Sequence, residues 1–133
     1  MRTLLCILVA LLLFGCGSPS RLSGKWKNEA GAQYEFGGGD SCEFVTPDPA
    51  VPGSRIRLKG TYGLSDDEKK VTIKMDLRPY YEGGNADSKN RINDMIYKDR
   101  EPKYDERVYD IVWHGNDGID LVGTGGPVRY KRQ

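Results

Sequence analysis

The chain has 133 residues and carries 20 Lys and Arg against 19 Asp and Glu, which gives a formal net charge of +1. This length suits one domain with a modest core. The near balance of charge, without a run of like charges or a basic stripe, excludes a typical nucleic-acid-binding protein.

The first fifteen residues are typical of a secretory signal. Arg2 supplies one positive charge and is followed by an apolar run from Leu4 to Phe14. That run is too short to span a bilayer, which needs about 20 apolar residues. A charged start, a short apolar run and a small residue at its end are the parts of a signal peptide. We therefore expect residues 1–15 to be removed during export.

The residues at the end of this run are Leu13, Phe14, Gly15 and Cys16, and they resemble the lipobox of bacterial lipoproteins. The lipobox has Leu three residues before the Cys and a small residue just before it. The resemblance implies that Cys16 receives a diacylglyceryl group, that signal peptidase II cuts after Gly15, and that the new amine is acylated, for example with palmitate. Two or three such chains anchor a protein to a membrane durably.

An ordinary signal peptide with a chance Cys is the alternative, with cleavage near Ser18 or Ser20. In bacterial lipoproteins, the residue after the lipidated Cys influences whether the protein stays in the inner membrane or is moved to the outer membrane. Here that residue is Gly17 rather than Asp, so the family's inner-membrane retention signal is absent. The resemblance then favours the outer membrane, with the protein facing the periplasm. The expected organisation is a signal peptide (1–15), a lipidated tether (16–23) and a β domain (24–133).

The three cysteines have three expected fates. Cys6 leaves with the signal and Cys16 carries lipid, so Cys42 has no intramolecular disulfide partner. We expect Cys42 to be buried as a small apolar residue. A redox or intermolecular role is the alternative, and neither a second Cys nor a nearby His supports it.

The pattern from Gly24 onward indicates β-structure. Tyr34 and Phe36 alternate with polar residues before the glycine-rich turn 37–40, and Cys42 and Phe44 continue the alternation after it. Residues 46–54 are rich in Pro and indicate a loop. The clearest alternation forms a predicted antiparallel hairpin. Its expected core residues are Ile56, Leu58, Tyr62, Val71, Ile73, Met75 and Leu77, and Lys74 lies on the opposite face.

The second half of the chain is less regular. Arg78–Asn90 is predicted to be a polar loop, and residues 91–104 fit either a helix or a strand. Val108–Trp113 predicts a strand, and the turn 115–118 joins it to a strand with Ile119 and Leu121. A last strand covers 128–132. About eight short strands with evenly spaced turns predict an all-β antiparallel barrel or sandwich.

A G-x-W at Gly24–Trp26, a G-x-Y at Gly60–Tyr62 and a terminal Tyr130–Arg132 occur in an order similar to that of short lipocalin-like domains of bacterial lipoproteins. In that family, the first-strand Trp lies at the closed end of the barrel, near a basic residue of the last strand. The resemblance implies that Arg132 lies within about 6 Å of the Trp26 ring, the range of a cation–π contact. Arg129 is the alternative basic residue for this contact, and it lies on the opposite face of the last strand.

Four further motifs contain residue types that can carry chemistry. His114 stands at a strand end without a recognisable nucleophile motif, so a surface histidine is favoured over a general base. Gly37–Asp40 precedes β-structure rather than a helix, which favours a hairpin turn over a phosphate loop. Asp66–Glu68 lacks the ligand spacing of a calcium loop and favours a solvated turn. Tyr80–Tyr81 could contact a partner or pack back onto the barrel edge.

These patterns assign no catalytic, cofactor-binding or metal-ligating residue, and Cys16 is the only site residue that we predict. The leading expectation is a non-catalytic, lipid-anchored lipoprotein of the cell envelope that binds a small apolar ligand. The alternative is an interaction module, such as an inhibitor or assembly factor of the envelope, that acts through an exposed loop. An enzyme is not expected, and neither is a nucleic-acid partner.

Overall fold

The computed structural model of the chain describes residues 20–83 and 86–133, with residues 86–90 described by their backbone. The predicted signal peptide and Cys16 lie outside the described residues. Nine strands and one helix occur within them. In chain order these are β1 (Gly24–Lys27), β2 (Gln33–Phe36), β3 (Ser41–Pro47), β4 (Arg55–Leu64), β5 (Lys70–Asp76), β6 (Tyr80–Glu82), α2 (Ala86–Asp99), β7 (Tyr104–His114), β8 (Gly118–Gly123) and β9 (Gly126–Arg132).

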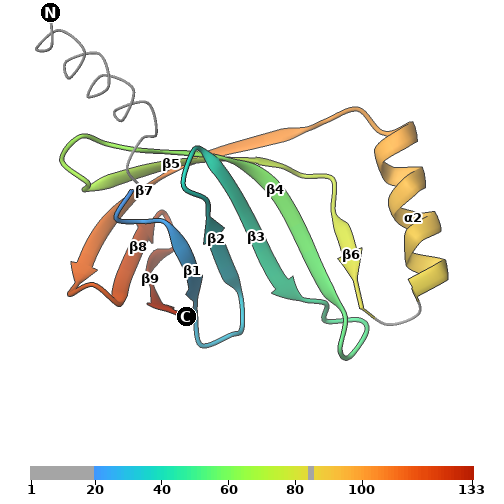
Figure 1. Cartoon of the computed structure of the whole chain (residues 1–133), viewed down its shortest axis with the longest axis horizontal. Coiled ribbons are helices and arrows are strands. Elements are labelled where there is room, and N and C mark those ends of the chain that lie inside the picture. Colours follow the sequence, from blue (N-terminus) through green and yellow to red (C-terminus); the bar gives the residue numbers. More distant parts are fainter. Residues whose placement is uncertain (1–19, 84–85) are drawn as a thin grey trace, which may run out of the picture.

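Eight of these strands form a closed antiparallel barrel (Figure 1). The order around the ring is β1, β2, β3, β4, β5, β7, β8 and β9, and β9 pairs with β1 to close it. β6 pairs with the first residues of β4 and lies outside the ring. The predicted all-β antiparallel fold is confirmed, and of the two predicted alternatives, a barrel and a sandwich, the structure is the barrel. β6 and α2 form an addition between β5 and β7.

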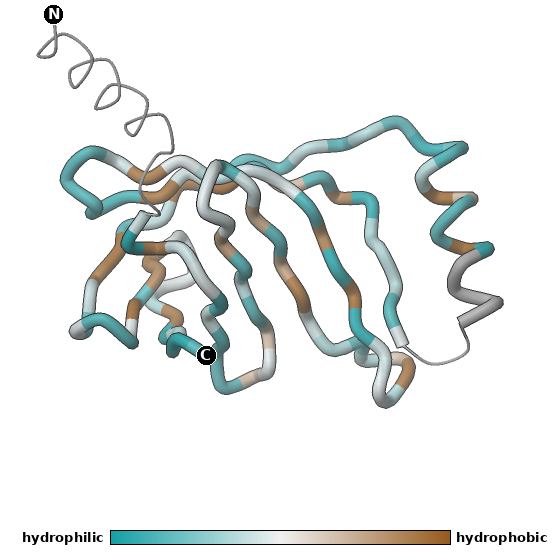
Figure 2. The backbone as a smooth tube through the Cα atoms, viewed as in Figure 1, coloured by the Kyte–Doolittle hydropathy of each residue, from teal (hydrophilic) through white to brown (hydrophobic). Residues whose placement is uncertain are grey.

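The central hairpin follows the predicted alternation of polar and apolar residues, which Figure 2 shows along β4. Tyr62 and Ile73 are cross-strand partners in β4 and β5, and both are buried. Gly60 marks a very close approach of the two strands, because a Cβ at this position would lie 2.0 Å from the Lys74 carbonyl oxygen. Glycine is therefore required here for steric reasons.

Three residues of the predicted hairpin core are less buried than expected. Leu77 is 40% exposed, so its assignment to the core is wrong. β5 ends at Asp76, and Leu77 follows at the rim of the barrel. Ile56 and Leu58 are half-buried, because they lie in the first part of β4, near the same rim.

The segment between β5 and β7 also corrects the sequence analysis. Arg78–Asn90 is not a plain polar loop, because it contains β6 and the start of α2. The ambiguous residues 91–104 are helical as far as Asp99, and β7 then begins at Tyr104. The helical alternative for this segment is therefore correct. Of the apolar residues Ile92, Met95 and Ile96, which have helical spacing, only Ile96 is buried.

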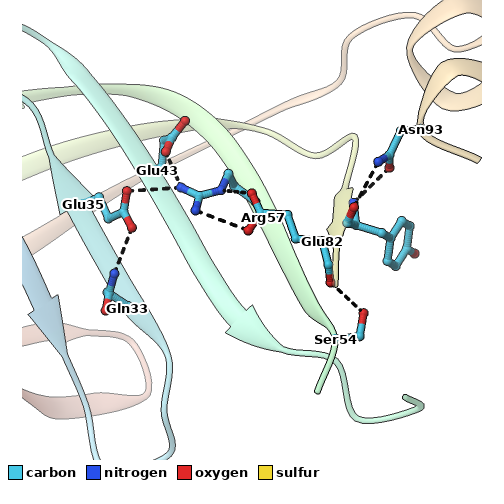
Figure 3. Close-up of polar contacts among 8 residues, drawn as sticks. Gln33, Glu35, Glu43, Ser54, Arg57, Glu82 and Asn93 are labelled. Carbon is cyan, nitrogen blue, oxygen red and sulfur yellow. Dashed lines mark hydrogen bonds and ion pairs between the residues drawn. The ribbon is translucent and has the colours of Figure 1, made fainter. Parts of the chain in front are cut away.

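β6 is fastened to the barrel through a charged cluster on Arg57 (Figure 3). The Arg57 Nε donates to Glu82 Oε1 of β6 at 2.7 Å. Its Nη1 donates to Glu35 of β2 at 3.1 Å and also to Glu43 of β3. The hydrogen bond to Glu82 is the main cause that raises the pKa of Arg57. One guanidinium thus joins β4 to three other strands.

Helix α2 covers the outer edge of β6. Asn93 is 4% exposed, and its side-chain amide bonds both backbone polar groups of Tyr81. Tyr97 of the helix also packs edge-on against Tyr80, with 6.4 Å between ring centres. The helix therefore replaces the next strand, and the sheet ends at β6.

Candidate functional site

The two ends of the barrel differ. At the end where the described chain begins, Leu22 and Trp26 are fully buried, and the Trp26 indole N–H donates to the Leu22 carbonyl at 2.8 Å. Arg21 covers the Trp113 ring at 4.0 Å, and Ser20 Oγ lies 2.9 Å from the Tyr62 hydroxyl. Residues 20–23, the described part of the predicted tether, are therefore a plug that seals this end rather than a free linker.

The opposite end is open. The strands that reach it differ in length, since β1 and β2 have four residues each whereas β4 has ten and β7 has eleven. The long strands therefore extend past the short ones on one side of the barrel (Figure 1). A cavity of about 210 Å³ lies at this end. Its lining residues are Tyr34, Phe44, Leu58, Ile73, Met75, Leu77, Asp105, Arg107 and Tyr109.

Most of this lining is apolar, and the polar groups gather on β2 and β7. Tyr34 packs against Phe44 with 4.9 Å between ring centres, and against Tyr130 with 5.5 Å. Burial, followed by the nearby Tyr109 and Tyr130, raises the pKa of Tyr34, so its hydroxyl stays protonated at neutral pH. The cavity thus combines an apolar wall with a neutral hydrogen-bonding group, as small-molecule sites do.

Two charged residues of β7 stand at the rim. The Arg107 Nε donates to Asp105 Oδ2 at 2.6 Å, and the Arg107 side chain is 67% exposed. The hydrogen bond to Asp105 is the main cause that raises the pKa of Arg107 above its ordinary value. An ion pair at the edge of an apolar cavity is suited to the polar end of an amphipathic molecule whose apolar part enters the barrel.

The sequence pattern missed these two rim residues. It predicts the inward face of Tyr109, Ile111 and Trp113 correctly, since Ile111 is buried and the other two pack on the core. It starts the strand at Val108, however, whereas β7 begins at Tyr104. Continuing the same alternation backwards from Tyr109 would have placed Arg107 and Asp105 on the inward side.

His114 lies exposed at the end of β7, as predicted. Its Nε2 is 2.9 Å from Asp120 Oδ2 and 3.1 Å from Arg129 Nη2. The Arg129 Nε also donates to Asp120, and this hydrogen bond is the main cause that lowers the pKa of Asp120 to about 2. Asp120 therefore stays ionised and pairs with Arg129, and His114 joins these two side chains in a hydrogen-bonded network on the outer face of β7, β8 and β9.

The two glycine- and aspartate-rich motifs are turns. Gly37 N–H donates to the Ser41 carbonyl at 2.8 Å, which closes the β2–β3 hairpin. Asp67 Oδ1 accepts from the Ser65 hydroxyl at 2.7 Å and from the Lys69 backbone N–H at 3.1 Å, within the β4–β5 turn. Among the side chains that the structure describes, those of residues 20–83 and 91–133, no group of three His, Cys, Asp or Glu is placed to hold a metal ion.

The adjacent tyrosines are not in a loop. Both belong to β6 and are half-buried, so Tyr80 and Tyr81 pack back onto the barrel edge, which is the second of the two predicted alternatives. Tyr81 lines a separate hollow of about 530 Å³ beside α2. The large exposed apolar side chains at this hollow are those of Val51, Ile92 and Met95.

Cys42 is buried, with 1% of its surface exposed, and it is a free thiol. Burial, with a smaller contribution from Glu43, raises its pKa to about 12. The thiol is therefore protonated and shielded, as the sequence predicts. The described ranges also contain no helix with the length and apolar character needed to cross a bilayer.

Comparison with known proteins adds support for the fold. No protein-family model matches the chain, and no curated protein matches it either. Among solved structures, the chain is similar to an uncharacterized protein from Bacteroides eggerthii, with 17% sequence identity and a TM-score of 0.51. The match covers 84% of this chain and 98% of that one. At this identity the likeness shows the shared fold and nothing about activity.

Proposed function

We propose that this protein is a non-catalytic, lipid-anchored lipoprotein of the cell envelope whose barrel binds a small apolar ligand through its open end. The observation that carries the ligand-binding part is the cavity of about 210 Å³, with Phe44, Leu58 and Met75 in its wall and Arg107 at its rim. The anchoring part is supported by the resemblance of Leu13–Cys16 to a lipobox.

The size of the cavity limits the ligand. An apolar cavity of about 150 Å³ admits a molecule the size of benzene. A cavity of about 210 Å³ therefore suits a single ring or a short acyl chain, smaller than the ligands that occupy most drug-sized pockets. The ion pair of Asp105 and Arg107 at the rim would face the polar end of such a molecule.

The position of the plug supports an orientation for the anchored protein. Cys16 is four residues before Ser20, which lies at the closed end beside Tyr62. Four residues reach at most about 14 Å. Lipid on Cys16 would thus hold the closed end close to the bilayer and leave the open end accessible from the aqueous phase. The ligand would then enter from the periplasm rather than from the anchoring membrane.

A titration of thermal stability tests ligand binding, because a molecule that binds the folded state alone raises the unfolding temperature. The matured protein in lipid nanodiscs is titrated with 1-octanol. We expect a saturable rise for the natural chain and none for Leu58→Trp, whose larger side chain fills the cavity. Lys59→Trp adds the same side chain on the outer face of β4 and should keep the rise. An equal response of all three chains would refute the site.

An interaction module of the cell envelope is the second candidate. The observation that favours it is the apolar hollow beside α2, at which Ile92 is 45% and Met95 63% exposed. Exposed apolar side chains that cluster in this way are typical of protein-contact surfaces. Absence of the octanol response, together with a partner cross-linked through position 95, would favour this candidate over the first.

A further inference from the structure

One edge of β7 lacks a neighbouring strand over the first half of its length. On one side, β5 pairs with Tyr104–Asp110. On the other side, β8 pairs with Asp110–His114 and no further. Among the described strands, residues 104–109 therefore have a partner on one side and an open edge on the other. This gap lies in the barrel wall, on the side where β8 and β9 end early.

The backbone hydrogen bonds between β5 and β7 show which residues of β7 direct their N–H and C=O groups toward the open edge. Ile111 N–H donates to the Lys69 carbonyl at 2.7 Å, and Leu77 N–H donates to the Lys103 carbonyl at 2.7 Å. In an antiparallel pair, alternate residues bond the same neighbour. The odd-numbered residues of β7 thus face β5. The residues whose N–H and C=O groups face the open edge are Tyr104, Glu106 and Val108.

The same residues are prominent at the surface, since Tyr104 is 55% and Val108 56% exposed. Beside them lies a hollow of about 560 Å³, between β7 and the β8–β9 turn. Its inner wall includes Leu121, Val128 and Tyr130. A Cβ built on Gly125 or Gly126 would meet no atom within 4 Å, so the turn leaves room beside the edge.

We propose that this edge of β7 binds an extended peptide segment of a partner protein, which adds as an antiparallel strand in the line of β8. The open edge presents alternating donors and acceptors, and an extended main chain is the partner that matches them. A neighbouring strand lies about 4.8 Å away, in the space that the hollow provides. This hollow adjoins the cavity at the open end, because Tyr34, Arg107 and Tyr109 line both. The peptide proposal rests on the open backbone edge of β7 and does not require that the cavity bind an apolar ligand.

The side chains of β7 define what the peptide should carry. Cross-strand neighbours lie on the same face of a sheet, and opposite charges there attract. A basic residue is therefore expected opposite Glu106, and an acidic residue opposite Arg107. The residue opposite Tyr109 faces the interior and should be apolar, because it enters the hollow beside Leu121.

A designed peptide tests the pairing. The probe is acetyl-Leu-Val-Glu-Lys-Thr-Val-amide carrying a fluorescent label, and its residues lie opposite positions 109 to 104 in turn. Fluorescence anisotropy with the purified protein, whether or not it carries lipid, should show saturable binding with a Kd below about 1 mM. The control peptide is N-methylated at its second, fourth and sixth residues, which removes the N–H groups that face β7. We expect its binding to be at least about tenfold weaker.

A pair of variants tests the same contact from the protein side. Glu106→Pro removes the N–H that faces the open edge and leaves the ladder to β5 in place, as proline permits on an edge. Glu106→Ala keeps that N–H. We expect Glu106→Pro to weaken peptide binding at least about tenfold more than Glu106→Ala does. Circular dichroism establishes that both variants fold, and if Glu106→Pro does not, the N-methylated peptide decides.

Three results would overturn the proposal. They are no saturable binding of the parent peptide at about 1 mM, equal binding of the parent and N-methylated peptides, and equal binding by the Pro and Ala variants when both fold. The protein could instead fail to bind the peptide and form a dimer. If Glu106→Pro then dissociates that dimer, the edge pairs with a second copy of the chain and not with a partner protein.

Discussion

The guanidinium of Arg132 lies 4.2 Å from the ring centre of Trp26, and the two residues are also cross-strand partners of β9 and β1. This contact is the one that the resemblance to lipocalin-like domains implies. Arg132 does more than cover the ring. It donates to the carbonyls of Ser23 at 2.6 Å, Arg21 at 2.9 Å and Asn116 at 2.9 Å, so it joins the plug to the last strand.

Arg132→Ala should therefore lower the free energy of unfolding by about 2–4 kcal/mol, through loss of the cation–π contact and of charge-assisted hydrogen bonds. Arg132→Lys should recover less than half, since an ammonium lacks the planar fork. Arg129→Ala, in the surface network with Asp120, should cost about 0–1 kcal/mol. Urea denaturation measures all three, and equal costs at 129 and 132 would contradict this role of Arg132.

The central hairpin gives a second stability test. Ile73 is 3% exposed, whereas Lys74 lies on the outer face with its Nζ 4.8 Å from the Tyr104 ring centre. Ile73→Ala should cost about 2–5 kcal/mol, because it leaves a cavity in the core. Lys74→Ala should cost less than about 1 kcal/mol. Chemical denaturation that found similar losses at the two positions would mean that the alternation does not define the core.

The amide of Asn93 should control the local stability of β6 and α2. Asn93→Leu keeps a side chain of similar size but leaves the N–H and C=O of Tyr81 without their partner, at a cost of about 1–3 kcal/mol. Hydrogen exchange should speed up at Tyr81 and in α2 but not in the barrel. Asp94→Ala, on the exposed face of the helix, is the matched control. Unchanged exchange in Asn93→Leu would refute this role.

Part of this fold can be predicted from the sequence. The period-two alternation predicts β4 and β5 because each of these strands has one face in the core and one in solvent, as Ile73 and Lys74 illustrate. The Trp26–Arg132 contact also followed from the resemblance. The hairpin depends on a local pattern of residues. The Trp26–Arg132 contact joins the first and last strands, which a closed barrel brings together.

β6 and α2 could not be predicted in the same way. β6 has three residues, too few for an alternation, and it is held by the Arg57 cluster, whose members are far apart in the sequence. The buried side of α2 includes the polar Asn93, while the apolar Met95 is 63% exposed, so the helix carries a weak apolar stripe. The sequence pattern does not predict the rim pair Asp105 and Arg107, because the recognisable alternation begins at Val108, four residues after the start of β7.

Cys42 should be unreactive in the folded protein. With its pKa raised to about 12, almost none of the thiol is ionised at pH 8, and the thiolate is the reactive form. In a matured chain with lipid on Cys16, iodoacetamide should label Cys42 roughly a thousandfold more slowly than an unfolded chain in urea. The folded rate should rise steadily with pH up to about 12. Rapid labelling of the folded protein at pH 8 would contradict the burial of the thiol.

Native mass spectrometry of the matured protein released from nanodiscs tests the central claim most directly, because one spectrum reports both the anchor and the bound molecule. The account predicts a chain that begins at Cys16 with added lipid, and a small organic molecule retained one-to-one. That molecule should be lost in Leu58→Trp and kept in Lys59→Trp. A chain that begins at another residue without lipid, or a spectrum with no small molecule that distinguishes the two variants, would contradict it.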